Sequence, residues 1–189
     1  YLIAGGLFFA SLILYIITLA PSVVTLFDDS LEFQLVTYQL GIAHPTGYPL
    51  YTILGKLFTL LPVGNVAYRV NLMSAVFGAA AVALLYLLIL PLSVPKNGVR
   101  IESHTPGWSM HLGSVIGALF LATSPVFWQQ ATVAEVYTLN AFFVALLLLL
   151  LVTPVQQRVQ TRALWLAFLT GLSLTHHRTM VFLLPALVL

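Results

Sequence analysis

The sequence contains no cysteine and very little charge. Without cysteine, disulfides, thiol catalysis and cysteine-based metal sites are excluded. Only 6% of the 189 residues are charged, against roughly 25% in soluble domains, whereas 60% are hydrophobic. A soluble globular domain is therefore excluded, and an integral membrane protein is indicated. The net charge is only +2 and the basic residues are scattered, which excludes a nucleic-acid partner.

Apolar runs long enough to cross a lipid bilayer recur along the chain. A spanning helix needs about 20 apolar residues. The pattern predicts an all-α, polytopic membrane protein of about five to six transmembrane helices, at residues 1–20, 70–95, 110–123, 136–153, 163–175 and from 180 onward. Residues 1–189 are interpreted as a single transmembrane module. Because it starts without methionine and stops inside an apolar run, we expect it to be part of a longer polypeptide.

The basic residues predict an orientation. Polar loops at 96–108 and 154–162 carry four of the seven Lys and Arg residues, and basic loops favour the cytoplasm. The N-terminus is then cytoplasmic, and the segments expected outside are 21–69, 124–135 and 176–178. The outer loop 21–69 is predicted to bear the functional site. Its two short helices, at 30–40 and 50–61, are expected to lie at the membrane interface.

Asp29 and Glu32 are the first candidates for chemistry. They are three residues apart, so on a helix they share a face. Paired carboxylates suit general-base catalysis, and their oxygens could also hold a divalent cation. The alternative is an ordinary surface helix whose acidic residues mark its first turn.

His44 and Tyr48 lie in a loop that two prolines and a glycine make rigid. Either they form the wall of a binding site or the loop is a structural turn. Arg69 stands at the outer end of an expected span, where it could bind an anion or extend to the interface.

Three more polar residues fall on the expected outer face. Glu135 directly precedes an expected membrane span. A carboxylate this close to the hydrocarbon core of the bilayer is costly, so it indicates a functional residue. His177 and Arg178 follow a short span and could bind a phosphate group, or could anchor the helix end in the interface. No zinc-protease, nucleotide P-loop or serine-hydrolase motif is present, and no metal-ligand set has clear spacing.

Five motifs in a fixed order resemble a widespread bacterial membrane family related to the transmembrane protein O-mannosyltransferases, within the GT-C glycosyltransferase superfamily. The motifs are Asp29-x-x-Glu32-Phe33, Gly41-Ile42-Ala43-His44-Pro45-x-Gly47-x-Pro49-Leu50-Tyr51, Arg69-Val70-Asn71-Leu72-x-Ser74-Ala75, Glu135-Val136-Tyr137-x-Leu139-Asn140 and Gly171-Leu172 with His177-x-Thr179. The resemblance covers nearly the whole chain.

The resemblance implies an inverting sugar transfer on the outer face of a bacterial plasma membrane. The donor would be a polyprenyl-phosphate-linked sugar, and the acceptor a hydroxyl of a protein or glycan. Asp29 would deprotonate that hydroxyl, and Glu32 would orient it. His177 with Arg178 would hold the lipid phosphate. His44, Tyr48, Arg69 and Glu135 are expected to contact substrate because of their own positions in the sequence.

A second hypothesis is a non-catalytic integral-membrane subunit of a larger complex, such as an electron-transfer complex. Small residues at 5–6, 78–81 and 113–117 could pack against helices of other membrane-complex subunits. A long gene product favours the enzyme. A short product that copurifies with other membrane proteins favours the subunit.

Overall fold

The computed structural model describes residues 1–24, 28–93, 107–153 and 159–188. Within these ranges the secondary structure is helical and contains no strand, which confirms the all-α prediction. The loops expected in the cytoplasm, at 96–108 and 154–162, lie mostly outside the described residues.

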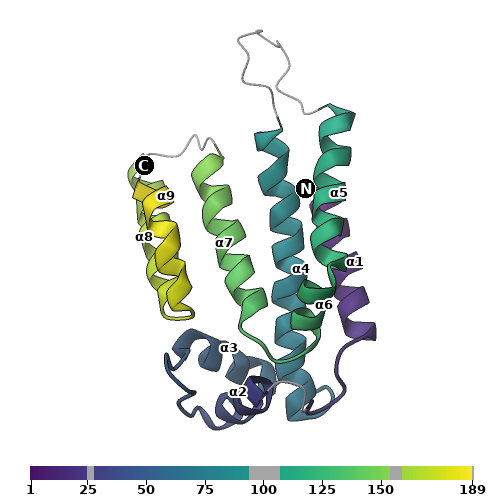
Figure 1. Ribbon diagram of the computed structural model, residues 1–189, viewed down its shortest axis with the longest axis vertical. Coiled ribbons are helices and arrows are strands. Elements are labelled where there is room, and N and C mark those ends of the chain that lie inside the picture. Colours follow the sequence, from purple (N-terminus) through teal and green to yellow (C-terminus); the bar gives the residue numbers. More distant parts are fainter. Residues whose placement is uncertain (25–27, 94–106, 154–158, 189) are drawn as a thin grey trace.

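Helix α4 (Val66–Leu92) is the centre of the molecule. It packs against α1 (Leu2–Ile17), α5 (Trp108–Thr123) and α7 (Tyr137–Val152), and Figure 1 shows it standing between α7 and α5. Small residues permit this close packing. A Cβ added at Gly78 would lie 3.4 Å from Tyr15 of α1 and 3.4 Å from Thr138 of α7.

One helix has the length and composition to cross a membrane, namely α4, with 27 residues. A second candidate is α5 together with α6 (Pro125–Thr132), but this pair bends by 61° at its break. α1 and α7 are apolar but have only 16 residues each, fewer than the about 20 that a span needs. The described residues therefore give one or two membrane-crossing candidates, and the expected five to six stay a prediction.

Helix α4 begins four residues earlier than the hydropathy pattern predicts. The side chain of Asn65 accepts a hydrogen bond of 2.9 Å from the backbone N–H of Tyr68, which makes Asn65 the N-cap. Arg69 consequently lies within the first turns of α4 rather than just before it.

Helices α2 (Asp28–Gln39) and α3 (Pro49–Thr59) lie across one end of the bundle, as Figure 1 shows. They match the two short helices expected at 30–40 and 50–61. They pack on each other and on α4. Gly55 makes the contact close, because a Cβ there would overlap the Cγ2 of Thr37.

The C-terminal segment, where a sixth span is expected to begin at residue 180, is helical. Helix α8 (Val159–Leu174) is followed by a turn and then by a 3-10 helix, η1 (Arg178–Leu183). The short helix α9 (Leu184–Val188) continues from it. The turn places residues 176–178 beside the α2–α3 end of the molecule (Figure 1).

Candidate functional site

Glu32 and His44 form the closest pair of charged and titratable side chains in the site. One Glu32 oxygen accepts the backbone N–H of His44 at 2.7 Å, and the other contacts the ring Nδ1 at 2.6 Å. Helix α2 supplies the carboxylate, and the loop between α2 and α3 supplies the imidazole. Both side chains are about one-third exposed, so the pair borders solvent.

Tyr48 connects this pair to the far end of the chain. Its ring centroid is 5.2 Å from that of His44 and 5.9 Å from that of His177. Tyr48 has φ 47°, a left-handed conformation that is costly for a residue with a large side chain and that clusters at functional sites. Burial, and next the Asp29 carboxylate, raise the pKa of the Tyr48 phenol.

The turn after α8 completes the cluster. The ring centroid of His177 lies 6.2 Å from that of Tyr137 on α7. Its Nδ1 lies 2.7 Å from the Thr179 hydroxyl and accepts the Thr179 backbone N–H. Burial, and next the charge of exposed Arg178, lower the pKa of His177. The Arg178 charge also offsets part of the rise in the Tyr48 pKa, so the guanidinium lies near both His177 and Tyr48.

Glu135 lies beneath the surface of the site and is only 3% exposed. Its Oε1 accepts a hydrogen bond of 2.9 Å from the Ser30 hydroxyl, beside Asp29 on α2. Its backbone pairs with the Ser74 hydroxyl of α4. Burial raises the pKa of Glu135, and the Ser30 hydrogen bond offsets part of that rise. The buried carboxyl thus joins α2 to the start of α7.

His176 is the buried neighbour of the site. Its Nε2–H donates to the Val136 carbonyl at 3.0 Å, and its ring stacks on Tyr51 with centroids 6.0 Å apart. Burial lowers the pKa of His176 to about 4. Its Nδ1 has no hydrogen-bond partner among the described residues. The hydrogen bond to Val136 ties the turn after α8 to the segment that carries Glu135.

Arg69 is placed differently from the other expected site residues. Its three guanidinium nitrogens donate to the carbonyls of Val63, Thr59 and Gly64. These bonds close the turn between α3 and α4. In the part of the chain that the structure describes, Arg69 shares no hydrogen bond with the other expected site residues.

Asp29 is exposed on α2 and close to Glu32 and His44. Each of the three offers one potential ligand atom, and these atoms lie within 4.8 Å of one another. Both Glu32 oxygens already contact His44, so a divalent cation there would have to share those oxygens with His44. Asp29 is the more open carboxylate, because it makes no side-chain hydrogen bond among the described residues.

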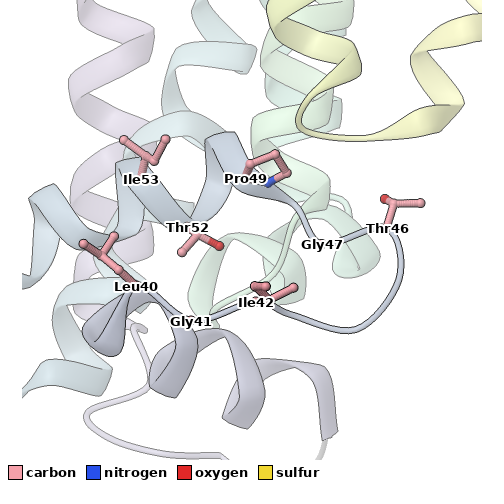
Figure 2. Close-up of a pocket in the computed structure, with 8 residues that line it drawn as sticks. All are labelled: Leu40, Gly41, Ile42, Thr46, Gly47, Pro49, Thr52 and Ile53. Carbon is pink, nitrogen blue, oxygen red and sulfur yellow. The ribbon is translucent and has the colours of Figure 1, made fainter.

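A pocket of about 400 Å³ opens beside the loop that carries His44 and Tyr48. Figure 2 shows its lining around the space between α3 and this loop: Leu40, Gly41, Ile42, Thr46, Gly47, Pro49, Thr52 and Ile53. The walls are mainly apolar. The Thr52 hydroxyl is buried and has no partner among the described residues.

Sequence reasoning did not identify three contacts that support the site. Ser30 binds Glu135, Tyr51 stacks on His176, and His176 binds the Val136 carbonyl. Tyr51 could have been found, because it ends the Gly41–Tyr51 motif that carries the resemblance. Ser30 and His176 act through partners about 105 and 40 residues away along the chain, which no local pattern signals.

Comparisons with known proteins identify the family to which the chain is similar. Residues 29–189 match the family described as protein O-mannosyl-transferase TMEM260 N-terminal domain. The chain is 37% identical over 166 residues to the Mus musculus protein O-mannosyl-transferase TMEM260, covering 85% of this chain and 21% of that protein. It is 30% identical over 193 residues to the Dictyostelium discoideum protein of the same description, covering 94% of this chain and 22% of that protein. The chain thus spans about a fifth of the length of these relatives. No solved structure matches it.

Proposed function

The chain belongs to the family of the protein O-mannosyl-transferase TMEM260 N-terminal domain, and from this premise we propose that it takes part in transferring a sugar to a protein hydroxyl. The donor in this proposal is a mannose-like sugar on polyprenyl phosphate, and transfer proceeds with inversion. The relatives' names support the transfer of mannose to protein. This chain would supply both the carboxylate that accepts the proton and the residues that bind the phosphate.

One observation carries the proposal. Four segments that are far apart in sequence meet at one end of the bundle: α2, the loop before α3, the start of α7 and the turn after α8. They bring together all the expected site residues except Arg69. Carboxylates, a histidine pair and an exposed arginine in one place suit a reaction that removes a proton and releases a phosphate.

The reaction can be assigned to named groups. The acceptor hydroxyl oxygen attacks the anomeric carbon, and its proton passes to the Asp29 carboxylate. The bond from that carbon to the phosphate oxygen breaks, and polyprenyl phosphate leaves with the electron pair. Asp29 is suited to this role because it is exposed, whereas Glu32 is held by His44 and Glu135 is buried. No step is routed through a divalent cation.

His177 and Arg178 are proposed to hold the phosphate. The His177 Nδ1 accepts the Thr179 backbone N–H, so the proton of the neutral ring is on Nε2. Nε2–H is then a donor for an anion. Arg178 is exposed beside it and adds a positive charge. Tyr48 and Tyr137, whose ring centroids lie 5.9 Å and 6.2 Å from that of His177, offer aromatic walls for a sugar ring.

The membrane placement belongs to the same proposal. Helix α4 crosses the bilayer, the bent α5–α6 pair enters it, and the shorter apolar helices complete the bundle. The N-terminus is cytoplasmic and the site faces outward, as the basic loops predict. In a bacterium this membrane is the plasma membrane, and the outward face gives access to secreted acceptors.

The test is transfer by the complete polypeptide in membranes, with a polyprenyl-phosphate mannose and a serine- or threonine-containing peptide. Asp29→Asn keeps the size of the side chain and removes the base. We expect transfer to fall by a factor of about 10² to 10⁴, the usual contribution of a general base. Asp28→Asn, the same change one residue earlier, is the matched control and should retain transfer. Full transfer by Asp29→Asn would remove Asp29 from the mechanism.

A further inference from the structure

The contact between Glu32 and His44 determines which ring nitrogen carries the proton. A carboxylate can only accept hydrogen bonds. One Glu32 oxygen receives the backbone N–H of His44, and the other lies 2.6 Å from Nδ1. Nδ1 must therefore carry the hydrogen. In the neutral ring, Nε2 is then a bare acceptor.

Among the described residues, the neighbours of His44 make no hydrogen bond to its Nε2 atom. The ring of His44 lies against Phe33 and Tyr48, with centroids 5.6 Å and 5.2 Å away. Among the described residues, no hydrogen-bond donor reaches Nε2. The side chain is 34% exposed, so the free nitrogen can meet a ligand. A carboxylate held on the far nitrogen is the usual means by which proteins fix an imidazole's orientation.

His177 provides the contrast within the same site. Its Nδ1 accepts the Thr179 backbone N–H, so its free Nε2–H is a donor. In His44 the proton is on Nδ1, so the free Nε2 is an acceptor. Tyr48 lies between the two rings, 5.2 Å from one and 5.9 Å from the other. The two histidines thus offer opposite hydrogen-bond polarity: a donor suits a phosphate, and an acceptor suits a hydroxyl.

We propose that His44 contacts the substrate directly, with Nε2 accepting a hydrogen bond from a substrate hydroxyl and Glu32 acting as the positioning residue that fixes its tautomer. The inference rests on the proposed glycosyl transfer, because that reaction brings hydroxyl groups to Asp29. The hydroxyl belongs either to the transferred sugar or to the acceptor side chain. Either source uses the same chemistry.

Two substitutions of His44 separate hydrogen bonding to substrate from structure. His44→Asn places an amide near the position of Nδ1, where it can still donate to Glu32, but it has no group at the Nε2 position. His44→Gln places an amide oxygen near the Nε2 position. We expect His44→Asn to lose about tenfold in kcat/KM, the value of one hydrogen bond, and His44→Gln to lose less. Equal activity of His44→Asn and the wild type would overturn the proposal.

The substrate whose KM rises in His44→Asn is the one that carries the hydroxyl. If the KM for the polyprenyl-phosphate mannose rises in His44→Asn, the hydroxyl is on the sugar. If the KM for the peptide rises, the hydroxyl is on the acceptor. Both results support the contact. A fall in kcat/KM that is the same for His44→Asn and His44→Gln would assign His44 to structure and reject the contact.

Glu32→Gln tests the tautomer without relying on activity. The backbone N–H of His44 requires an acceptor, so the Gln oxygen must face it and the Gln NH₂ must face Nδ1. The proton then moves to Nε2, which becomes a donor. Nitrogen NMR of histidine-labelled protein should show Nδ1 protonated in the wild type and Nε2 protonated in Glu32→Gln. A wild-type Nδ1 without a proton would overturn the proposal. A wild type that transfers no sugar would instead reject the proposed function and leave this tautomer measurable.

Discussion

At the scale of single residues, two arginines on the same side of the molecule are used in opposite ways. Arg69 donates to three backbone carbonyls and closes a turn, whereas Arg178 is exposed beside His177. The sequence places both at helix ends but does not show which one is available. That depends on where the carbonyls after α3 point, which only the folded chain decides. Arg178 is therefore the cation we assign to substrate.

His176 gives a prediction of how stability depends on pH. Burial lowers its folded pKa from 6.5 to about 4, so the unfolded chain binds the proton more tightly. The stability that the neutral ring contributes is full above pH 6.5 and is lost as pH falls toward 4. Over that window the loss amounts to about 3 kcal/mol. The wild type should unfold at a lower temperature at about pH 5 than at about pH 7.

His176→Gln is the comparison for this pH effect, because its amide can still donate to the Val136 carbonyl and does not titrate. Its unfolding temperature should change less between the two pH values. Glu135 has a raised pKa, so its contribution runs the other way and weakens as pH rises. Glu135 is present in both proteins, so the difference between them isolates His176. Identical pH profiles would show that His176 is not buried as a neutral ring.

At the scale of helices, the packing of α2 on α3 depends on Gly55. An added Cβ would overlap Thr37 Cγ2 and lie 2.8 Å from Thr37 Cβ. We expect Gly55→Ala to destabilise the protein by about 1–3 kcal/mol, the cost of overpacking a close contact. Gly113→Ala is the matched control, because a Cβ there meets nothing within 4 Å. Thermal unfolding of both variants in detergent measures the difference, and equal midpoints would contradict the close contact.

The helices also show what the sequence could predict. Periodicity and proline positions placed α2 and α3 to within two residues of their ends, because turn residues mark the boundaries. The start of α4 was predicted four residues late, because hydropathy does not recognise the Asn65 cap. The segment predicted to begin a sixth span opens with a 3-10 helix, η1, before α9. Hydropathy records composition and is insensitive to the hydrogen-bond pattern of a single turn.

At the scale of the whole molecule, the site residues were predicted to share one face, and the structure brings all of them to one end of the bundle, with Arg69 bonded to the α3–α4 turn and apart from the others. The sequence reached this through topology alone, by assigning polar segments to one side of the membrane. It could not supply the pairings, such as Glu32 with His44 or Ser30 with Glu135, because these depend on the rotation of each helix. The outward direction of that end is still a prediction.

The absence of cysteine in this chain makes that direction measurable. Single cysteines at Thr46 and Gln129, both exposed near the site end, should react with a membrane-impermeant maleimide in intact cells. A cysteine at Ser103, in a loop predicted to be cytoplasmic, should react only after permeabilisation, because the bilayer excludes the reagent. Cysteines elsewhere in the complete polypeptide are replaced beforehand. The reverse pattern would place the site in the cytoplasm, away from secreted acceptors. That result would reject the outward orientation while leaving the geometry of the cluster unchanged.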